Sequence, residues 1–307
     1  MKRVVVILVD WNGEEVTREC LESLKQVELP STLTLTAILV DNGSSKPIEK
    51  NIVDEFPFLT LLRSESNLGF TGGNNLGIER AQLQKPDYLL FLNNDTVVST
   101  DFLTPLFNYL ESHPMVGAVQ PKICFYPNRS YLWNAGNKFY KWVSQTGVIG
   151  YRELDKNENT VAKEQSWLTG CSILARAELF TGQHGLRFND RFFALYEDVD
   201  LSFRIRQRGF KLFYIPFSTI YHRAGYSSNY KVKTKEGYTH PFMIYLHSRN
   251  RIWIARLYTP FYFWPTTFLF LCAYYLLLIP YFLFRGRFRK TILVIKAIKD
   301  GILTKPI

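Results

Sequence analysis

The sequence predicts an α/β protein with a doubly wound, mostly parallel mixed sheet flanked by helices, followed by a hydrophobic helical tail. Strand and helix patterns alternate along the first hundred residues, which is the order that builds a parallel sheet. Polar residues follow three of the expected strands, and a long uncharged run lies near the C-terminus. We therefore expect one α/β domain over residues 1–230 and a basic, aromatic, membrane-associating helical region over residues 231–307.

The first expected strand covers residues 4–9, a run of six apolar residues typical of a strand buried on both faces of a sheet. Further strands are expected over residues 36–40, 59–62 and 88–92, with helices over 14–25 and 71–83. In the second half we expect regular structure over residues 167–175, an apolar run over 192–196, a helix over 197–208 and short strands over 212–215 and 219–221.

Polar side chains stand at the carboxyl ends of three expected strands. Asp10 and Asn12 follow the first strand, Asp41 and Asn42 end the second, and residues 93–95 (Asn-Asn-Asp) follow the fourth. Ligands of such sheets bind beyond the carboxyl ends of the strands. These groups therefore give the first indication of a binding site.

Length and composition describe a globular chain. The 307 residues are 47% hydrophobic and 21% charged without a biased tract, which excludes long disorder and fibrous structure. The four cysteines are widely spaced and form no CxxC pair. A disulfide framework or a structural zinc site is therefore not expected, and the chain fits a reducing compartment. The apolar run near the N-terminus is too short for a signal peptide, so no secretion signal is expected.

The net charge of +10 is concentrated in the tail. Residues 231–307 hold thirteen Lys or Arg and two acids, whereas the preceding residues are nearly neutral, which does not fit a uniformly basic nucleic-acid binder. Residues 257–284 are 28 consecutive uncharged residues, and ~18 suffice to indicate a membrane helix. Three prolines interrupt the run, so a kinked span, a re-entrant hairpin and an interfacial helix all fit. The alternative is a buried core helix at a homodimer interface. Four basic residues within 285–290 follow, as expected at a cytoplasmic flank or an anionic lipid surface.

Two acidic sites could carry chemistry. Asp95 closes an apolar strand, and oxygen ligands there suit Mg²⁺ or Mn²⁺ bridging a diphosphate; the alternative is a polar turn. Glu197, Asp198 and Asp200 gather three carboxylates at a helix start, where their repulsion is costly unless a cation or a proton relieves it. One of them could act as a general base, and the alternative is capping of the helix. His222 ends an apolar stretch, and a lone histidine is more often structural than a ligand.

Six sequence blocks, taken in order, resemble a known family. They are DNGSS (residues 41–45), NLGFTGGNN (67–75), LLFLNND (89–95), WLTGCSILAR (167–176), FFALYEDVDLSFRIRQRGF (192–210) and IYH (220–222). Together they resemble the inverting family 2 glycosyltransferases, and in particular the bacterial rhamnosyltransferase-like subgroup. The resemblance covers about residues 3–223.

The resemblance implies a GT-A fold with a nucleotide-binding first half and an acceptor-binding second half. Residues 93–95 stand where the family has its DxD motif, with Asn93 in place of the first acid, which leaves Asp95 as the main carboxylate on the metal. His222 matches a histidine that some members use as a further metal ligand, and Asp198 matches the catalytic base. Asp10, at the end of the first expected strand, is a residue less typical of the family at that position. The other implied donor contacts are Trp11, Asn12, Asp41, Asn67, Gly69, Gly73, Asn74, Asn93 and Asn94. The implied acceptor or sugar wall is Trp167, Gly170, Glu197 and Asp200.

The implied function is a metal-dependent, inverting transfer of a sugar from a nucleoside diphosphate sugar to a hydroxyl of a saccharide acceptor, in cell-surface polysaccharide synthesis. Thymidine diphosphate (dTDP) rhamnose is the leading donor, and UDP-sugars follow. The acceptor is expected to be lipid-linked, at the cytoplasmic face of the bacterial inner membrane, and truncation near Lys235 is expected to release a soluble catalytic domain. No nucleic-acid partner is expected.

Three alternatives remain beside this function. The first is a polyprenyl-phosphate glycosyltransferase. The second is a non-catalytic nucleotide-sugar-binding protein, against which the intact Glu197, Asp198 and Asp95 argue. The third is a dehydrogenase, which would need a GxGxxG turn after the first strand, where residues 11–13 are Trp-Asn-Gly.

Overall fold

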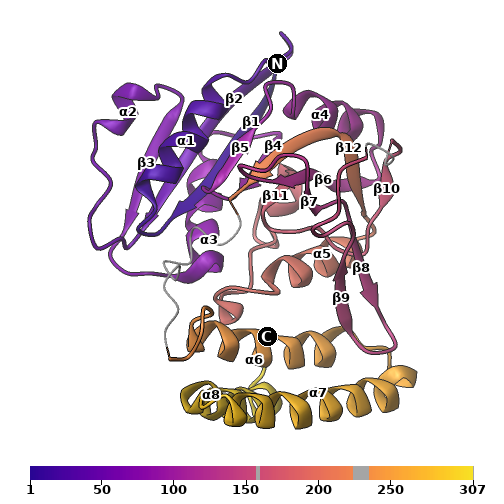
Figure 1. Cartoon of the computed structure of the whole chain (residues 1–307). Helices are drawn as coiled ribbons and strands as arrows, with labels where there is room; N and C mark the ends of the chain where they lie inside the picture. The colour runs from indigo at the N-terminus through magenta and orange to yellow at the C-terminus, as the bar shows by residue number, and fades with distance from the viewer. Residues whose placement is uncertain (157–159, 224–234, 307) are drawn as a thin grey trace.

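The computed structural model describes residues 1–156, 160–223 and 235–306, which form a mixed sheet covered by helices and a separate helical layer (Figure 1). The strands are β1 (Lys2–Asp10), β2 (Leu33–Asn42), β3 (Leu59–Ser64), β4 (Tyr88–Leu92), β5 (Thr96–Val98), β6 (Val116–Phe125), β7 (Leu132–Asn134), β8 (Asn137–Tyr140), β9 (Gln145–Val148), β10 (Lys163–Glu164), β11 (Ser172–Arg176) and β12 (Lys211–His222). The α-helices are α1 (Glu14–Lys25), α2 (Ile52–Glu55), α3 (Gly69–Gln82), α4 (Leu103–Ser112), α5 (Glu197–Gln207), α6 (Pro241–Tyr258), α7 (Trp264–Phe284) and α8 (Phe288–Leu303). Short 3₁₀ helices are η1 (Ala177–Phe180), η2 (Asp190–Phe192) and η3 (Phe261–Phe263).

The main sheet has the strand order β10-β12-β6-β11-β4-β1-β2-β3, with β5 beside β12 and β7 beside β6. Strands β4, β1, β2 and β3 are parallel neighbours, β12 is parallel to β6, and β11 runs antiparallel to both β4 and β6. The prediction of a doubly wound, mostly parallel mixed sheet is therefore confirmed.

Strand β1 lies at the centre of the core because its side chains are apolar on both faces. Val4, Val6 and Leu8 join one cluster together with residues of α1 and α4. Val5 and Ile7 join a second cluster on the opposite face, with residues of α3. Two such faces, each covered by helices, explain why the sequence of β1 does not alternate between apolar and polar residues.

Three expected elements differ from the structure in their extent. The two short strands expected over residues 212–215 and 219–221 are one strand, β12, whose register with β6 shifts between Ile215 and Thr219. Only Ser172–Arg176 of the stretch 167–175 pairs as a strand. Residues 193–196 form a loop in which Phe193, Leu195 and Tyr196 have positive φ angles, so the apolar run there is not regular structure.

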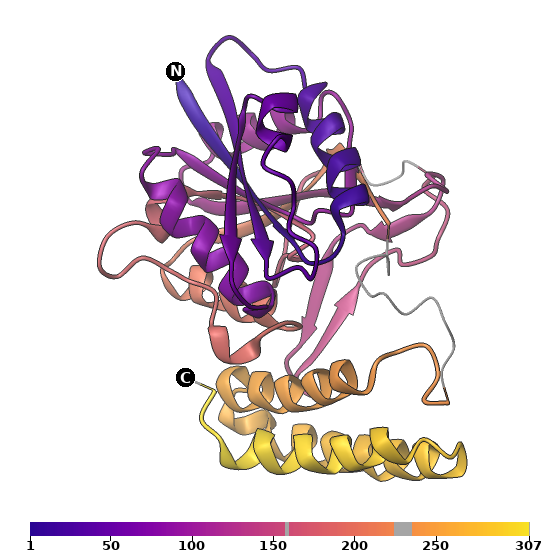
Figure 2. The ribbon, with the colours of Figure 1, turned by 90° about the vertical axis from the view of Figure 1, so that its left-hand side faces the viewer.

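The C-terminal helices form a layer beneath the α/β part of the molecule. Both views place α6 between the α/β part and the pair α7–α8 (Figures 1 and 2). The expected domain boundary at residues 230 and 231 lies outside the described residues. One segment of the described chain, Phe261–Phe284, is long and apolar enough to cross a membrane, with a mean hydropathy of 2.0. The expected apolar helix at the C-terminal end is therefore confirmed as a helix.

Candidate active site

Asp10 joins the carboxyl ends of three strands from a fully buried position. Its carboxylate accepts hydrogen bonds from Thr17 Oγ1 at 2.7 Å, Asn94 Nδ2 at 2.9 Å and Ser44 Oγ at 3.3 Å. Burial raises the pKa of Asp10, and hydrogen bonds from Thr17, Gly13 and Ser44 act in the opposite direction. Asp10 is thus a structural centre that the sequence analysis undervalued. The side-chain amide of Asn94, expected at the donor, is committed to this cluster.

Asp41 shapes the loop that follows β2. Its buried carboxylate accepts the backbone N–H groups of Ser44 at 3.0 Å and Ile48 at 3.1 Å and pairs with Arg63. Burial alone would raise the pKa of Asp41, but these hydrogen bonds hold it below its usual value. Asp41 therefore holds the loop after β2 through these hydrogen bonds, and its expected contact with the nucleotide stays a prediction.

Trp11 and Asn12 lie beside that loop, after β1. Asn12 has a φ of 56° and accepts hydrogen bonds from Ser45 N and Ser45 Oγ, both at 2.8 Å. Trp11 is exposed next to it. The backbone of Asn12 is therefore fixed at the strand end, and the Trp11 ring is accessible there to a ligand.

The glycine-rich segment at the start of α3 connects the donor side of the sheet to the loop before α5. Asn42 Nδ2 donates to Asn67 Oδ1 at 3.2 Å and to Gly69 O at 2.9 Å. Gly69 has a φ of +73°, and a Cβ atom there would lie 2.4 Å from the carbonyl oxygen of Phe193. The backbone N–H of Thr71 donates to the same oxygen at 3.2 Å. Gly69 is therefore required by a close backbone approach.

Gly73 and Asn74 both make packing contacts that hold α3 in place. A Cβ atom on Gly73 would lie 2.6 Å from the side chain of Val9, so the glycine allows α3 to pack against β1. Asn74 is buried and donates to Phe70 O at 2.8 Å. Both positions were expected to contact the donor, and the structure gives both a packing role.

Asp95 and His222 meet where β5 pairs with β12. Thr96 is the register partner of His222, which brings Asp95 Oδ1 to 3.0 Å from His222 Nε2, and both side chains are buried. The Trp133 ring packs edge-on against the imidazole, with ring centroids 4.6 Å apart. Burial alone would lower the pKa of His222, but Cys171 and Asp95 raise it well above its usual value.

This pair fits a divalent cation. Two ligand atoms about 3 Å apart are at the separation expected for neighbouring ligands on an ion with bonds of about 2.1 Å. A carboxylate oxygen and an imidazole nitrogen are both ligands that such ions accept. Over residues 1–156, 160–223 and 235–306, no group of three or more His, Cys, Asp or Glu side chains converges on one point. The pair would therefore need further ligands from a diphosphate or water.

Asp198 lies at the start of α5, close to the same edge of the sheet. Its carboxylate accepts the backbone N–H of Gly170 at 2.9 Å and that of Val199 at 2.8 Å. The next residue after Gly170 is Cys171, whose carbonyl accepts the N–H of Asn93 at 2.9 Å. Burial raises the pKa of Asp198 to about 6, even though the hydrogen bonds from Gly170 and Val199 favour the charged form. A half-buried carboxylate with such a pKa suits a general base near neutral pH.

The remaining residues expected at the acceptor wall have other surroundings. Asp200 is fully buried. Its carboxylate accepts hydrogen bonds from Arg204 Nε at 2.8 Å, from Arg204 Nη2 at 2.6 Å and from the Tyr258 hydroxyl at 2.6 Å. Trp167 is buried in a core cluster and donates to the backbone carbonyl of Lys138 at 2.9 Å. Asp200 and Trp167 are therefore both bonded within the folded chain, and their expected place at the acceptor wall stays a prediction.

Glu197 remains beside the base. It is buried, and its pKa is raised well above the usual value by burial and by the charges of Asp198 and Asp200. Within the described ranges, Glu197 Oε2 has no hydrogen-bond partner. Burial and the neighbouring carboxylates therefore both disfavour the charged form of Glu197.

Helix α6 contributes residues that the sequence analysis missed. Asn250 is fully buried, and its Nδ2 atom donates to the carbonyl oxygens of Phe192, Ala194 and Leu195 at 3.1, 2.9 and 2.8 Å. These carbonyls belong to the positive-φ loop that leads into Glu197 and Asp198. In the sequence Asn250 is one polar residue among several in α6, so nothing there indicated its partner. Tyr258, also on α6, bonds Asp200 as described above.

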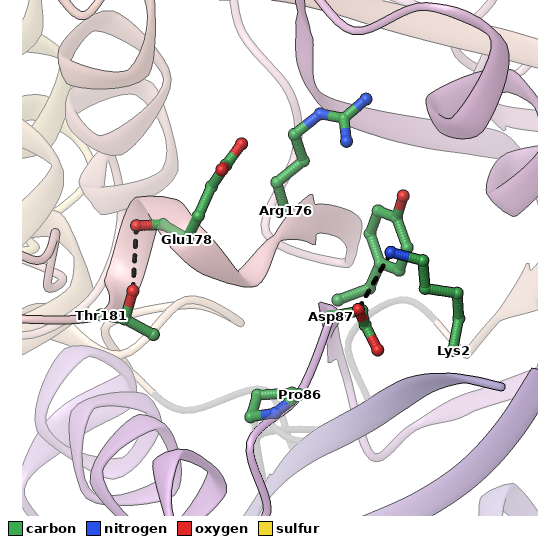
Figure 3. Close-up of a pocket in the computed structure, with 7 residues that line it drawn as sticks. Lys2, Pro86, Asp87, Arg176, Glu178 and Thr181 are labelled. Atoms are coloured by element: carbon green, nitrogen blue, oxygen red, sulfur yellow. Dashed lines mark hydrogen bonds and ion pairs between the residues drawn. The ribbon is translucent and has the colours of Figure 1, made fainter.

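A cavity of about 290 Å³ lies at the opposite end of the sheet (Figure 3). Its wall includes Lys2 and Asp87, which form an ion pair at 3.1 Å, and Arg176, which donates to the carbonyl of Val116 at 2.8 Å. Lys2 begins β1 and Tyr88 begins β4, so the cavity is at the amino ends of the parallel strands. Because the cavity lies at the end of the sheet opposite the polar strand ends, we assign it no part in the chemistry.

Polar groups gathered at the carboxyl ends of β1, β2 and β4 in a mixed α/β sheet are the arrangement of the GT-A class of glycosyltransferases. The model of the family described as Glycosyl transferase family 2 matches residues 5–175, more than half of the chain. The chain belongs to this family and is a glycosyltransferase.

Two relatives among characterised proteins are rhamnosyltransferases by name. The N-acetylglucosaminyl-diphospho-decaprenol L-rhamnosyltransferase of Mycobacterium tuberculosis is 26% identical over 228 residues, which cover 67% of this chain and 72% of the relative. Rhamnosyltransferase WbbL of Escherichia coli (strain K12) is 24% identical over 224 residues, covering 69% of this chain and 80% of the relative.

Two solved structures share the fold. Residues 1–349 of S. aureus TarS in complex with UDP-GlcNAc match with a TM-score of 0.63 and 16% identity, covering 98% of this chain and 81% of that one. GalNAc-T7 with UDP, GalNAc and Mn²⁺ matches with a TM-score of 0.56 and 19% identity, covering 71% of this chain and 42% of that one. At these identities the likeness establishes the GT-A fold.

Proposed function

We propose that this protein transfers a sugar from a nucleoside diphosphate sugar to a hydroxyl group of a saccharide acceptor, with inversion at the anomeric carbon and Asp198 as the general base. The observation that carries the proposal is the position of Asp198. Its carboxylate accepts hydrogen bonds from the N–H groups of Gly170 and Val199 and has a pKa of about 6. Cys171, which follows Gly170, is hydrogen-bonded to Asn93, two residues before Asp95 of the Asp95–His222 pair.

In this mechanism Asp198 takes the proton of the acceptor hydroxyl while its oxygen attacks the anomeric carbon. The attack comes from the face opposite the leaving diphosphate, so the anomeric configuration inverts. Glu197 lies beside it with a pKa that burial and the charges of Asp198 and Asp200 raise, which favours Asp198 as the group that carries the negative charge. The two backbone hydrogen bonds orient Asp198 so that little motion is needed at the moment of reaction.

Asp95 and His222 are the residues that would hold Mg²⁺ or Mn²⁺. Such an ion, when bound, would neutralise the negative charge that develops on the diphosphate as the sugar leaves. Asn93, half-buried between Asp95 and the carboxyl end of β4, remains a candidate contact to the nucleotide. The accessible ring of Trp11 is a candidate to stack on the base.

The proposed donor is a dTDP- or UDP-sugar, and rhamnose is the first sugar to test because both relatives reported above are named for its transfer. The proposed acceptor is a lipid-linked saccharide used in cell-surface polysaccharide synthesis. One of those relatives carries a diphospho-decaprenol saccharide in its name. The proposed location is the cytoplasmic face of the bacterial inner membrane, which the exposed apolar helix α7 supports.

The test of the reaction uses the purified full-length protein with a panel of nucleotide sugars and Mg²⁺ or Mn²⁺, and measures nucleotide release. Asp198→Asn should lower turnover by roughly 10²–10⁴-fold, because it removes the proton acceptor and keeps the size of the side chain. Donor affinity should stay unchanged. Asp101→Asn, on the surface, is the control. Turnover near that of the unaltered protein in Asp198→Asn would contradict the assignment.

The test of the metal site measures donor affinity while Mn²⁺ is titrated. Asp95→Ala should remove the dependence of donor affinity on Mn²⁺, and His222→Ala should give a milder form of the same defect. If donor affinity in Asp95→Ala still rises with Mn²⁺ as in the unaltered protein, Asp95 is a turn residue and the metal role is wrong.

A further inference from the structure

We propose that α7, α8 and the tip of the β8–β9 hairpin form one face that rests on an anionic lipid bilayer, with α7 lying in the membrane plane instead of crossing it. We call this surface the α7–α8 face. The inference rests on the membrane location proposed above. Its test measures membrane binding separately from sugar transfer.

Helix α7 exposes a stripe of apolar side chains. Leu269, Leu276 and Leu277 are 66%, 72% and 74% exposed, and Phe284 at the end of the helix is 92% exposed. Positions three, four, seven and eight apart share one side of a helix, so these residues form a continuous face. Only 22% of the residues in the most apolar 18-residue stretch of this segment are buried, which does not fit a core helix.

Helix α8 continues this surface. Phe288, Ile292, Ile295 and Ile302 are all exposed and share one side of the helix. The opposite sides of α7 and α8 pack into one cluster with residues of α6, including Ile252, so the exposed sides of both helices point away from α6. Both ribbon views place α7 and α8 in the outermost layer, on the far side of α6 from the sheet (Figures 1 and 2).

Helix α7 is attached to the protein along its length. Near its start the Thr266 hydroxyl donates to the carbonyl of Trp142, which lies in the turn between β8 and β9. In its middle the Tyr275 hydroxyl donates to the carbonyl of Ser248 on α6 at 2.8 Å. A helix held in this way presents one side to its surroundings, whereas a spanning helix would be surrounded by lipid.

The chemistry of α6 argues against a spanning arrangement. Helix α6 packs against α7 and carries His247, Arg249 and Arg251, which contact the loop before α5. If α7 crossed the bilayer while it kept its contacts with α6, then α6 and these charged groups would enter the hydrocarbon core. Ionisable side chains are costly there. In-plane binding places only the apolar side of α7 in lipid and keeps α6 outside.

The charges around the face fit anionic lipid. Arg285, Arg289, Lys296 and Lys299 are exposed beside the apolar side chains. Of the acids in the described part of the tail, Asp300 accepts a hydrogen bond from Tyr245 at 2.7 Å and Glu236 accepts the backbone N–H of Arg289 at 3.2 Å. Basic residues near anionic lipid attract it, whereas two copies of this basic face would repel each other.

Exposed aromatic residues mark the edge of the face near the β8–β9 hairpin. Trp142 is 55% exposed at the tip of the hairpin, and Phe261 and Tyr262 are exposed just before α7. The hydrogen bond from Thr266 to Trp142 brings the two segments together. Trp and Tyr are enriched where protein meets the lipid headgroups, so this edge would lie at headgroup level.

The first test is flotation of the purified full-length protein with vesicles of phosphatidylcholine, with and without phosphatidylglycerol. We expect binding to the anionic vesicles that salt weakens. Lys296→Gln with Lys299→Gln should reduce it about 25-fold, since each basic residue contributes roughly fivefold. Leu276→Ser with Leu277→Ser should reduce binding by about tenfold or more, since it removes apolar burial. The control is Leu83→Ser, a leucine of the α/β part that is equally exposed.

Nucleotide release from the donor sugar should be unchanged in all these variants, which separates a failure of membrane binding from a failure of the proposed reaction. Absence of binding to anionic vesicles, or equal loss in Leu83→Ser, would overturn the proposal. So would a stable dimer that Leu276→Ser with Leu277→Ser dissociates, because the face would then be covered by a second copy.

The second test distinguishes in-plane binding from a span. Tyr262→Cys and Arg285→Cys place single thiols at the two ends of α7 in a Cys272→Ser background, in which the other three cysteines are buried. A membrane-impermeant maleimide is added outside sealed vesicles that carry the bound protein. Labelling of both positions supports the in-plane arrangement. Labelling at one end only would show that α7 crosses the bilayer.

Discussion

Helices α6 and α7 follow each other in the same hydrophobic tail and have opposite relations to the rest of the molecule. Helix α6 buries Asn250 against the loop that leads into the proposed catalytic carboxylate, and it buries Ile254 in a core cluster with Phe192. Helix α7 is more apolar and yet exposes Leu276 and Leu277. The comparison teaches that hydropathy alone does not tell whether a helix is part of the core, supports a site or faces the surroundings of the protein.

The largest expected effect concerns the packing of α6. Ile254→Ala should lower the free energy of unfolding by about 2–5 kcal/mol, because it leaves a cavity between α6 and the cluster that includes Phe192 and Val199. Denaturant unfolding measures this. A loss below about 0.5 kcal/mol, the range of ordinary surface substitutions, would mean that α6 is not part of the folded catalytic unit.

The next effect concerns the loop that α6 holds. Asn250→Ala should lower kcat by about tenfold to hundredfold, because a loop free to shift misplaces Asp198. The KM for the donor should change little, since the donor residues lie on other elements. The control is Ser248→Ala on the same helix, because the buried Ser248 hydroxyl has no hydrogen-bond partner within the described ranges. Equal kcat values in the two variants would contradict a positioning role for Asn250.

The same comparison can be sharpened with pH. Since Asp198 must be deprotonated to accept a proton, kcat should fall below pH about 6, by about tenfold per pH unit. Burial is the main cause of the raised pKa, so Asn250→Ala, which opens the loop to water, should move this limb to lower pH. A pH–rate profile of both proteins measures the shift. A limb that stays at the same pH in the variant would show that α6 does not maintain the burial of Asp198.

The smallest expected effect concerns α7. Leu277→Ala should change the free energy of unfolding by less than about 0.5 kcal/mol, because the side chain contacts little of the protein. The same denaturant experiment as for Ile254→Ala gives a direct contrast between the two helices. A loss comparable to that of Ile254→Ala would mean that the exposed side of α7 is covered in solution.

The truncation expected near Lys235 has a different meaning in the structure. Cutting there removes α6 together with α7 and α8, and with α6 the side chains that bond residues 191–200. We therefore expect the truncated chain to lose the contacts that hold this loop and to lack an intact catalytic domain. A boundary between the catalytic part and the tail is therefore better drawn after α6 than before it, because α6 is hydrogen-bonded to residues 191–200.

Much of the site could be anticipated because its signals are local. Asp95, Asp198 and His222 each end or begin an element that the apolar pattern delimits, and the structure brings Asp95 and His222 together through the pairing of β5 with β12. Asp200 and Trp167 were expected at the acceptor wall because their sequence blocks resemble the family. Their partners, Tyr258 and Lys138, lie 58 and 29 residues away, and only packing identifies them.

The sequence by itself determined β1 to β4, helices α1 and α3 and the polar groups at the strand ends, since runs of apolar residues and turn residues act over a few neighbouring positions. It did not predict α4 or β6, although β6 is a buried strand inside the sheet. Only the tertiary structure decided that Asp10 is a structural centre, that β12 is one strand, and that Asn250 holds the catalytic loop from 55 to 58 residues away. It also decided that α7 lies against α6 with one side exposed. The physical reason is that a side chain's burial and its hydrogen-bond partners depend on which distant segments cover it, and no local pattern of residues encodes that.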